Sequence, residues 1–313
     1  MKYCIGVDMG GTTTKIGLFS SEGKLMDKKE IPTRVALGRK SVFQDIAACI
    51  RTLTQAHAVM LSDCSVGMGV PGPIDETGYA DVMVNLDMYD FYPGKELSEL
   101  LDGIPVKAAN DANVAALGEM WQGGGKGYKS LLFVTLGTGV GGGIILNERI
   151  LHGAHGLGGE IGHIWVNPDE PETCNCGGHG CLDQMASATG IVRNAKRFMA
   201  KSEKPSALEK FDNLTAKDVF DAAKAGDAIA EKTVDYCMGF LGKNIADVTY
   251  VIDPEVVVIG GGLSKAGQYL LDVVYNHYKR YPKLKKCLSD FRLAELGGDA
   301  GMYGAARLAL EEK

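Results

Sequence analysis

The sequence of 313 residues has no apolar run long enough to cross a membrane. Its longest weakly polar stretch, residues 131–146, is interrupted by glycines and is shorter than the ~20 apolar residues of a spanning helix. The sequence also has no block of Lys and Arg, and 39 acidic residues outnumber 33 basic ones. A sequence-independent grip on nucleic acid needs a basic face. We therefore expect neither a membrane nor a nucleic acid as a partner.

A secretory leader is also missing, because Asp8 follows only a very short apolar stretch. The expected location is then the cytoplasm, where thiols stay reduced. Five of the eight cysteines are scattered along the chain, and we interpret them as buried thiols. The other three, Cys174, Cys176 and Cys181, lie together. In a reducing compartment such a cluster indicates a metal site rather than a disulfide framework.

Glycine, in contrast, is in excess, with 42 residues against an average usage near 7%. The glycines gather in short loops. Residues 8–14 lie between predicted strands 3–7 and 15–19, and residues 137–143 lie between predicted strands 130–136 and 144–146. Two copies of a strand, a Gly/Thr turn and a second strand indicate a duplicated two-domain α/β plan. A third cluster, residues 260–262, follows a strand that begins near residue 255.

The two Gly/Thr turns are candidate phosphate loops. Backbone N–H groups can converge on anionic oxygens where no Cβ blocks the approach. The hydroxyl groups of Thr12, Thr13 and Thr138 can add donors. A pair of such loops with an acidic residue, Asp8, predicts a bound triphosphate, although tight turns with a purely structural role remain an alternative. The Gly-x-x-x-x-Gly-Lys-Ser/Thr motif is absent, so the sequence is not that of a P-loop protein.

The second turn also matches another motif. Gly137-x-Gly139-x-x-Gly142 has the spacing of the dinucleotide fingerprint, and Glu160 follows 18 residues after Gly142. That fingerprint requires its third glycine to open a helix. Here the next residues, 144–146, are Ile-Ile-Leu and indicate a strand. We therefore regard nicotinamide binding as the weaker interpretation.

The cysteine cluster has the composition of a zinc site. His163 precedes Cys174, Cys176 and Cys181, and one imidazole with three thiolates completes a tetrahedral set for Zn²⁺. Because no position is left open for water, the zinc is expected to be structural. His179, inside the loop, is a competing ligand, and three unrelated thiols in a Gly-rich loop are the alternative without a metal.

Carboxylates and amides complete the set of candidate residues. Asn110 and Asp111 stand at a strand end before a predicted helix, where functional groups gather in α/β folds, although an Asp there can also be a helix N-cap. Glu160 lies three residues before His163, so one helical turn would place both side chains on one face. Asp183 lies two residues after the last cysteine of the cluster. A fixed array of acids and amides suits a polyhydroxylated ligand.

Together these motifs resemble the ROK family of sugar kinases and sugar-responsive repressors. The resemblance rests on Asp8-x-Gly-Gly-Thr, Asn110-Asp111, Leu136-Gly-Thr-Gly-Val-Gly-Gly, Glu160-x-Gly-His and Cys174-x-Cys-Gly-x-x-Gly-Cys, and it runs from residue 5 to about residue 305. Within the family the sequence is most similar to bacterial glucokinases. The resemblance implies the two-domain actin-like ATPase fold with an interdomain cleft. We expect a smaller N-terminal domain of residues 1–115, joined by a C-terminal helix at about 300–313, and a larger domain of residues 116–299 with the zinc loop.

The resemblance also implies roles for individual residues. Asp111 would be the general base for a sugar hydroxyl, and Asp8 would act on Mg²⁺. Sugar hydroxyls would be bound by Asn110, Glu160, His163, Asp183 and Gly72. The phosphates and nucleoside of ATP would be bound by Gly10, Gly11, Thr12, Thr13, Gly137, Thr138, Gly139 and Gly261. His163 would use its second ring nitrogen on the zinc. A homodimer or homotetramer is the implied assembly.

Two departures from the family bear on the substrate. Family glucokinases usually carry Glu two residues after the last zinc cysteine, where this sequence has Asp183, and Met88-Tyr89 stands where relatives often have Trp. Glucose is therefore the first expectation, with N-acetylmannosamine, N-acetylglucosamine, fructose and allose as alternatives. A sugar-sensing module without catalysis is the alternative from another class. The repressors of the family carry a DNA-binding extension, for which the seven residues before Asp8 are too few.

Overall fold

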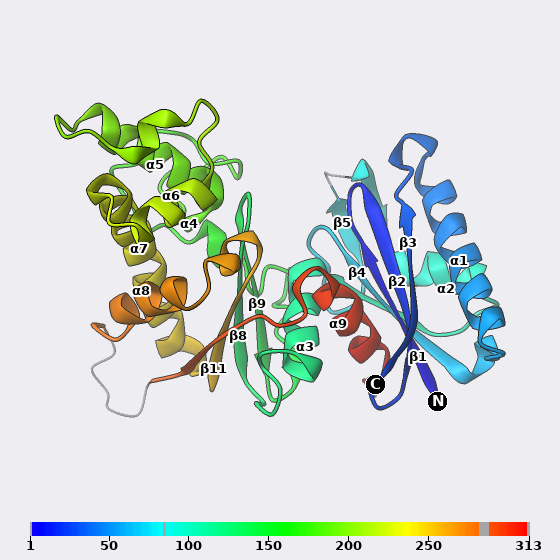
Figure 1. The fold of residues 1–313 in the computed structure, drawn as a ribbon. Coiled ribbons are helices and arrows are strands. Elements are labelled where there is room, and N and C mark those ends of the chain that lie inside the picture. Colours follow the sequence, from blue (N-terminus) through cyan, green and yellow to red (C-terminus); the bar gives the residue numbers. More distant parts are fainter. Residues whose placement is uncertain (1, 84–85, 282–287, 312–313) are drawn as a thin grey trace. The chain divides into compact units, whose positions relative to one another are not determined.

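The computed structural model describes residues 2–83, 86–281 and 288–311, and its two large sheets repeat one strand order (Figure 1). The first sheet has the order β3-β2-β1-β4-β7. Its strands are β1 (Tyr3–Met9), β2 (Thr13–Ser20), β3 (Leu25–Pro32), β4 (Cys64–Val70) and β7 (Val106–Asn110). Strands β1 to β3 are antiparallel neighbours, whereas β1, β4 and β7 run parallel.

The second sheet has the order β10-β9-β8-β11-β12, the same arrangement of three consecutive strands followed by two more. Its strands are β8 (Leu131–Leu136), β9 (Val140–Leu146), β10 (Arg149–Ile150), β11 (Val256–Gly260) and β12 (Asp290–Leu293). A small pair consists of β5 (Ala80–Met83) and β6 (Met88–Phe91). The repeated order confirms the duplicated α/β plan.

Helices connect and flank these strands. The α-helices are α1 (Arg39–Ala56), α2 (Pro93–Leu100), α3 (Asp111–Gln122), α4 (Leu182–Ala186), α5 (Ala188–Ala200), α6 (Ala216–Lys224), α7 (Ala228–Ile252), α8 (Gln268–Tyr278) and α9 (Ala300–Ala309). Short 3-10 helices are η1 (Val35–Leu37), η2 (Leu61–Asp63), η4 (Ile161–His163), η5 (Ala207–Lys210), η6 (Gly262–Ala266) and η7 (Gly297–Asp299). Among the residues that the structure describes, none of these helices is both long and apolar enough to traverse a lipid bilayer.

The burial of the strands follows their place in the sheets. Strands β4 and β11 are buried along their whole length, as expected for uninterrupted apolar runs that are covered on both faces. The edge strand β3 is largely exposed and carries charged residues, which protects a free edge from pairing with other chains. The first predicted turn is shorter than expected, because β1 continues through Asp8 and Met9, which pair with Lys15 and Thr14 of β2.

Packing divides the chain into two compact units. Unit 1 comprises residues 1–131, 143–159 and 295–313, and unit 2 comprises residues 132–142 and 160–294. In unit 1 the C-terminal helix α9 packs against α3, so the two lie side by side (Figure 1). The domain boundary after residue 115, expected from the sequence, falls inside α3. The expected domain boundaries stay a prediction.

The scattered cysteines are mostly buried. Cys4, Cys64 and Cys237 are buried thiols, and Cys49 is half-buried. Burial raises the pKa of the Cys4 thiol to about 12, which makes it unreactive at neutral pH. Cys287 lies outside the described residues.

A buried carboxylate joins α3 to the C-terminal segment in unit 1. The side chain of Glu119 is fully buried. Its Oε2 accepts hydrogen bonds from the backbone N–H groups of Gly124 at 2.9 Å and Glu295 at 3.0 Å, and its Oε1 accepts one from Leu296 at 2.9 Å. The carboxylate thus satisfies three backbone donors that would otherwise lose water without gaining a partner.

We expect Glu119→Ala to lower the free energy of unfolding by about 3 kcal/mol or more, because each buried donor left unsatisfied costs about 1–3 kcal/mol. Urea unfolding followed by circular dichroism measures this loss. The control is Glu99→Ala, an exposed Glu of α2, for which we expect a change within about 0.5 kcal/mol. A loss below about 1 kcal/mol in Glu119→Ala would contradict the assigned role.

Candidate functional site

Asp111 is the first residue of α3, directly after β7. The helix is capped by the residue before it: the side-chain oxygen of Asn110 accepts hydrogen bonds from the N–H groups of Ala112 at 2.9 Å and Asn113 at 3.2 Å. One oxygen of Asp111 also accepts from the N–H of Ala112, at 2.8 Å. Because Asn110 fills the N-cap position, the capping role considered for Asp111 belongs to its neighbour.

Asn110 also connects this strand end to the loop after β4. Its Nδ2 donates a hydrogen bond to the carbonyl oxygen of Gly72 at 3.1 Å. The Asn110 side chain is thus held at both ends and is 7% exposed. The structure therefore brings together Asn110, Asp111 and Gly72, three of the predicted site residues.

Asp8 lies near the carboxyl end of β1 in the same unit. Burial, followed by the negative charge of Asp111, raises the pKa of Asp8 from its ordinary value of 3.8 to about 6, against the opposing effect of Lys15. A Cβ on Gly301 would lie 2.6 Å from the carboxyl carbon of Asp8, so α9 approaches this carboxylate closely. Two carboxylates that destabilise each other's charge favour a bound cation, and oxygen ligands suit Mg²⁺.

The first Gly/Thr turn joins β1 to β2, as predicted. Gly10 donates its N–H to the carbonyl oxygen of Thr13 at 3.0 Å and closes the turn. Gly11, Thr12 and Thr13 are exposed. Their N–H and hydroxyl groups are therefore accessible to a ligand.

The second turn, in unit 2, joins β8 to β9. Gly137 donates its N–H to the carbonyl oxygen of Gly139 at 2.9 Å. Residues 140–146 form a strand, so the third glycine of the fingerprint-like spacing opens no helix, and the nicotinamide interpretation loses its structural requirement. Gly261 lies against the start of this turn: it has φ +80°, and a Cβ there would come within 2.4 Å of the Leu136 carbonyl oxygen.

His163, Cys174, Cys176 and Cys181 form one cluster in unit 2, with one ligand atom of each within 4.8 Å of all the others. Cys176 Sγ and Cys181 Sγ are 3.6 Å apart, and Cys174 Sγ and His163 Nδ1 are 3.8 Å apart. Tetrahedral Zn²⁺ at ordinary bond lengths separates its ligand atoms by about 3.6–3.8 Å. The four residues therefore fit a zinc ion. His179, the competing ligand, instead places Nδ1 3.0 Å from the Glu172 carbonyl oxygen.

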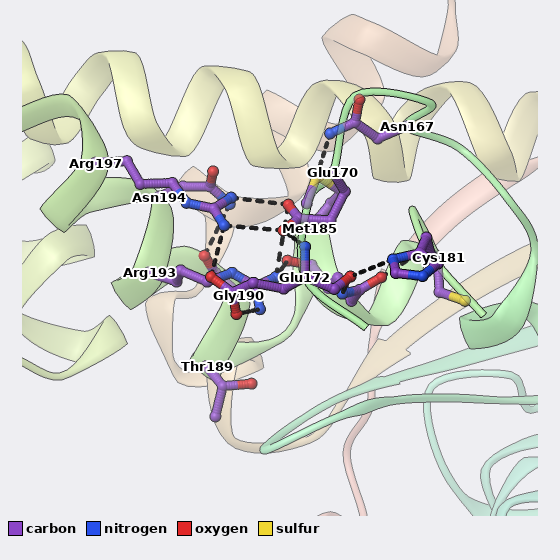
Figure 2. Close-up of polar contacts among 12 residues, drawn as sticks. Asn167, Glu170, Glu172, Cys181, Met185, Thr189, Gly190, Arg193, Asn194 and Arg197 are labelled. Carbon is purple, nitrogen blue, oxygen red and sulfur yellow. Dashed lines mark hydrogen bonds and ion pairs between the residues drawn. The ribbon is translucent and has the colours of Figure 1, made fainter. Parts of the chain in front are cut away.

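The zinc loop, residues 163–181, is anchored to α5 by ion pairs (Figure 2). The Glu170 side chain has no exposed surface, and both its oxygens accept hydrogen bonds from Arg197, at 2.8 and 2.9 Å. Arg193 donates to Glu172 at 2.9 Å. The hydrogen bonds from Arg197 are the main reason that the pKa of Glu170 lies below its ordinary value. The loop is thus attached to unit 2 independently of the metal ligands.

Glu160 and Asp183 lie at the two ends of this region. Glu160 is exposed and stands before η4, whose last residue is His163. Its backbone carbonyl oxygen accepts the N–H of His163 at 3.2 Å, so this turn is helical as the spacing suggested. Asp183 lies in the first turn of α4, and its Oδ1 accepts the N–H of Val140 at 2.6 Å.

A hollow of about 500 Å³ lies beside the second Gly/Thr turn in unit 2. It is lined by Thr138 together with Ala188, Thr189, Val192, Arg193, Lys196, Leu214, Thr215 and Ala216. Sequence reasoning named only Thr138 of this set. The others come from α5 and from the start of α6, and nothing in the helical pattern of these segments marks them as ligand-binding residues.

Comparison with known proteins decides the family. The model of the ROK family matches residues 4–312. A glucokinase from Halalkalibacterium halodurans is 43% identical, over 100% of this chain and 96% of its own length. An N-acetylmannosamine kinase from Escherichia fergusonii is 31% identical, over 99% of both chains. A crystal structure of a ROK family glucokinase from Streptomyces griseus, in complex with glucose and AMPPNP, is 31% identical, covers 98% of both chains and has a TM-score of 0.76.

The chain belongs to the ROK family. Its fold is the actin-like ATPase fold of ROK sugar kinases, as the motifs implied. Unit 1 carries Asp8, the first Gly/Thr turn, Gly72, Asn110 and Asp111. Unit 2 carries the second turn, the zinc cluster, Glu160, Asp183 and Gly261. The roles of these residues in this ROK protein stay predictions.

The raised pKa of Asp8 predicts an effect of pH on stability. Since the folded pKa of about 6 exceeds the ordinary value of 3.8, the stabilisation by the protonated carboxyl is complete below about pH 4 and is lost as the pH rises through 6. A shift of about two pKa units corresponds to about 3 kcal/mol. We expect metal-free Asp8→Asn protein to be about 3 kcal/mol more stable than the wild type at pH 8 and equally stable at pH 4.

Urea unfolding of both proteins in EDTA between pH 4 and pH 8 measures this difference. Because all other groups titrate alike in the two proteins, the difference isolates Asp8. A difference that stays constant with pH would contradict the assignment of the raised pKa.

Proposed function

We propose that this ROK protein transfers the γ-phosphoryl group of ATP to a hexose, with glucose as the preferred acceptor and its 6-hydroxyl as the attacking group. The observation that carries the proposal is the placement of Asp111 at the start of α3. Asn110 supplies the cap, so the helix does not need Asp111, and an acidic residue in the first turn has another use. The full-length similarity to glucokinases supports the same reaction.

In the proposed mechanism Asp111 accepts the proton of the sugar hydroxyl as the new P–O bond forms. Asn110, Glu160 and His163 orient the sugar through hydrogen bonds, and Gly72 contributes backbone groups. The two Gly/Thr turns and Gly261 hold the nucleotide. Phosphoryl transfer leaves little covalent work to a protein, so orientation of the hydroxyl and neutralisation of the phosphate charge account for most of the acceleration.

Two metal ions complete the proposal. Asp8 would hold Mg²⁺, through water, and the ion supplies positive charge to the phosphate oxygens when bound. His163 and the three cysteines would hold Zn²⁺, which orders the loop and leaves no position open for water. His163 would bind the zinc through Nδ1, the atom that lies near Cys174 Sγ, and the sugar through Nε2.

A second candidate function is phosphorylation of a different sugar, which one feature favours. Asp183 replaces the Glu of family glucokinases, and its Oδ1 is engaged by Val140. The identity of 31% to an N-acetylmannosamine kinase names one such acceptor, beside N-acetylglucosamine, fructose and allose. A sugar-sensing module without turnover remains the candidate from another class. A cytoplasmic location and a homodimer or homotetramer remain expectations.

The deciding experiment is ADP release from MgATP across a panel of hexoses and N-acetylhexosamines. Turnover that depends on glucose supports the proposal. A silent glucose sample with another sugar active would assign the second candidate. Folded protein that binds a sugar but releases no ADP with any member of the panel would favour the sensing module.

A further inference from the structure

The second Gly/Thr turn is held by the segment that directly follows the zinc loop. Three hydrogen bonds connect residues 183–189 to residues 137–140. The Oδ1 of Asp183 accepts the N–H of Val140 at 2.6 Å. The N–H of Ala188 donates to the Gly137 carbonyl oxygen at 2.8 Å, and the hydroxyl of Thr189 donates to the Thr138 carbonyl oxygen at 2.9 Å.

These bonds decide which way the peptide groups of the turn point. In a trans peptide the carbonyl of one residue and the N–H of the next point in opposite directions. Because the carbonyl oxygens of Gly137 and Thr138 point toward donors of α5, the N–H groups of Thr138 and Gly139 point away from α5. Two successive N–H groups with a common direction form an anion-binding concavity of the kind that phosphates occupy.

Asp183 fixes the last peptide of this turn. The carbonyl of Gly139 accepts the N–H of Gly137, and the N–H of Val140, on the other side of the same peptide, donates to Asp183. Hydrogen bonds to an ionised carboxylate are about twice as strong as those between neutral groups. Without this acceptor the peptide between Gly139 and Val140 can rotate, and glycine imposes no barrier of its own.

Gly139 is shaped to the same contact. A Cβ at this position would lie 2.7 Å from the Oδ1 of Asp183, closer than real Cβ atoms approach an oxygen. The short side chain of Asp183 starts from α4 and has little room to withdraw. A side chain at residue 139 would therefore push the carboxylate away from Val140.

We propose that Asp183 is a positioning residue, which holds the turn of residues 137–140 in the conformation that binds the phosphates of ATP. The inference rests on the proposed kinase function, and it replaces the contact with sugar that the family resemblance implies for Asp183. Asp183 acts through the N–H of Val140. Its removal should weaken nucleotide binding and leave sugar binding nearly unchanged.

The kinetic experiment compares Asp183→Ala with the wild type. We expect the KM for ATP to rise about 10- to 100-fold while the KM for glucose changes less than threefold, as for a lost charge-assisted hydrogen bond. Asp183→Asn retains an oxygen acceptor and should restore most of the ATP affinity. Asp247→Ala, an exposed Asp of α7 in the same unit, serves as the control and should match the wild type. A rise in the KM for glucose alone would overturn the proposal.

A second measurement does not depend on catalysis. Hydrogen–deuterium exchange of the Val140 amide, in protein without ligands, reports its hydrogen bond to Asp183 directly. We expect at least tenfold faster exchange in Asp183→Ala and in Gly139→Ala, with zinc content and melting temperature close to the wild-type values. The double variant should exchange no faster than either single variant, because both changes break one contact.

The two measurements separate the two hypotheses. If the wild type phosphorylates no sugar, the proposed function fails, and the exchange rates together with the affinity for a non-hydrolysable ATP analogue still test Asp183. Equal Val140 exchange in the wild type and Asp183→Ala would overturn the proposal whatever the activity.

Discussion

Asp111→Ala is expected to lower kcat for sugar phosphorylation by at least about 10³-fold, because a positioned general base contributes about 10²–10⁴-fold and the variant has no group in its place. Asp111→Asn should lose nearly as much, since the amide has the shape of the carboxylate but accepts no proton. The KM for glucose should change much less than kcat, because Asn110 and the other hydrogen-bonding residues remain. ADP release at saturating MgATP measures both parameters.

The structure predicts that these variants fold. The N-cap hydrogen bonds of α3 come from Asn110 and persist without Asp111. Loss of an acidic residue from the first turn of a helix costs about 0.3–1 kcal/mol. Asp111→Asn should also lower the pKa of Asp8, because the negative charge of Asp111 is the second cause of its elevation after burial.

Asp102→Asn is the matched control. Asp102 lies in the same unit, its side chain is 73% exposed, and it pairs with Arg51 at the surface. We expect its kcat to equal that of the wild type. Activity of Asp111→Ala within tenfold of the wild type would show that another group accepts the proton.

Cys176→Ser is expected to lose the metal and to lower stability strongly. A serine hydroxyl is not ionised at neutral pH and cannot replace a thiolate ligand. Structural zinc sites contribute on the order of 10 kcal/mol, and much of this free energy depends on the complete ligand set. Regular structure in the described part of the zinc loop is limited to η4 and the isolated bridges Trp165–Cys181 and Thr173–His179, so the metal carries much of the loop's order.

The expected zinc content, by atomic emission, is one ion per chain in the wild type and near zero in Cys176→Ser. The melting temperature should fall in the variant and fall equally when the wild type is treated with a chelator. Cys49→Ser, a half-buried thiol of unit 1, should retain the zinc. Wild-type protein purified without chelators and free of zinc would refute the assignment.

Unfolding in this variant should be local at first. The ion pairs of Glu170 and Glu172 with Arg193 and Arg197 attach one part of the loop to α5 and do not involve the metal. The segment from Cys174 to Cys181 has no comparable anchor among the contacts described above, so it should lose order first. Because Asp183 follows this segment, the Gly/Thr turn that it holds should also gain mobility.

Features that depend on short stretches of chain could be predicted from the sequence. The zinc cluster is such a feature, because its four residues lie within one short loop and the spacing brings them together. The two Gly/Thr turns are another, since each joins neighbouring antiparallel strands. The repetition of the pattern was sufficient to predict the duplicated sheet plan, and the motifs were sufficient for the family.

The tertiary structure decided the features in which distant residues meet. Only the backbone path shows that Asn110 caps α3 and that Asp111 stands inside it. The pKa of Asp8 depends on burial and on Asp111, neither of which is encoded near residue 8. Asp183 and Val140 are 43 residues apart, and their hydrogen bond exists because α4 packs against the β8–β9 turn. Residue types and spacing thus determined the chemistry that this chain can hold, whereas burial and hydrogen-bond partners, which depend on the packing of whole elements, decided what individual side chains do.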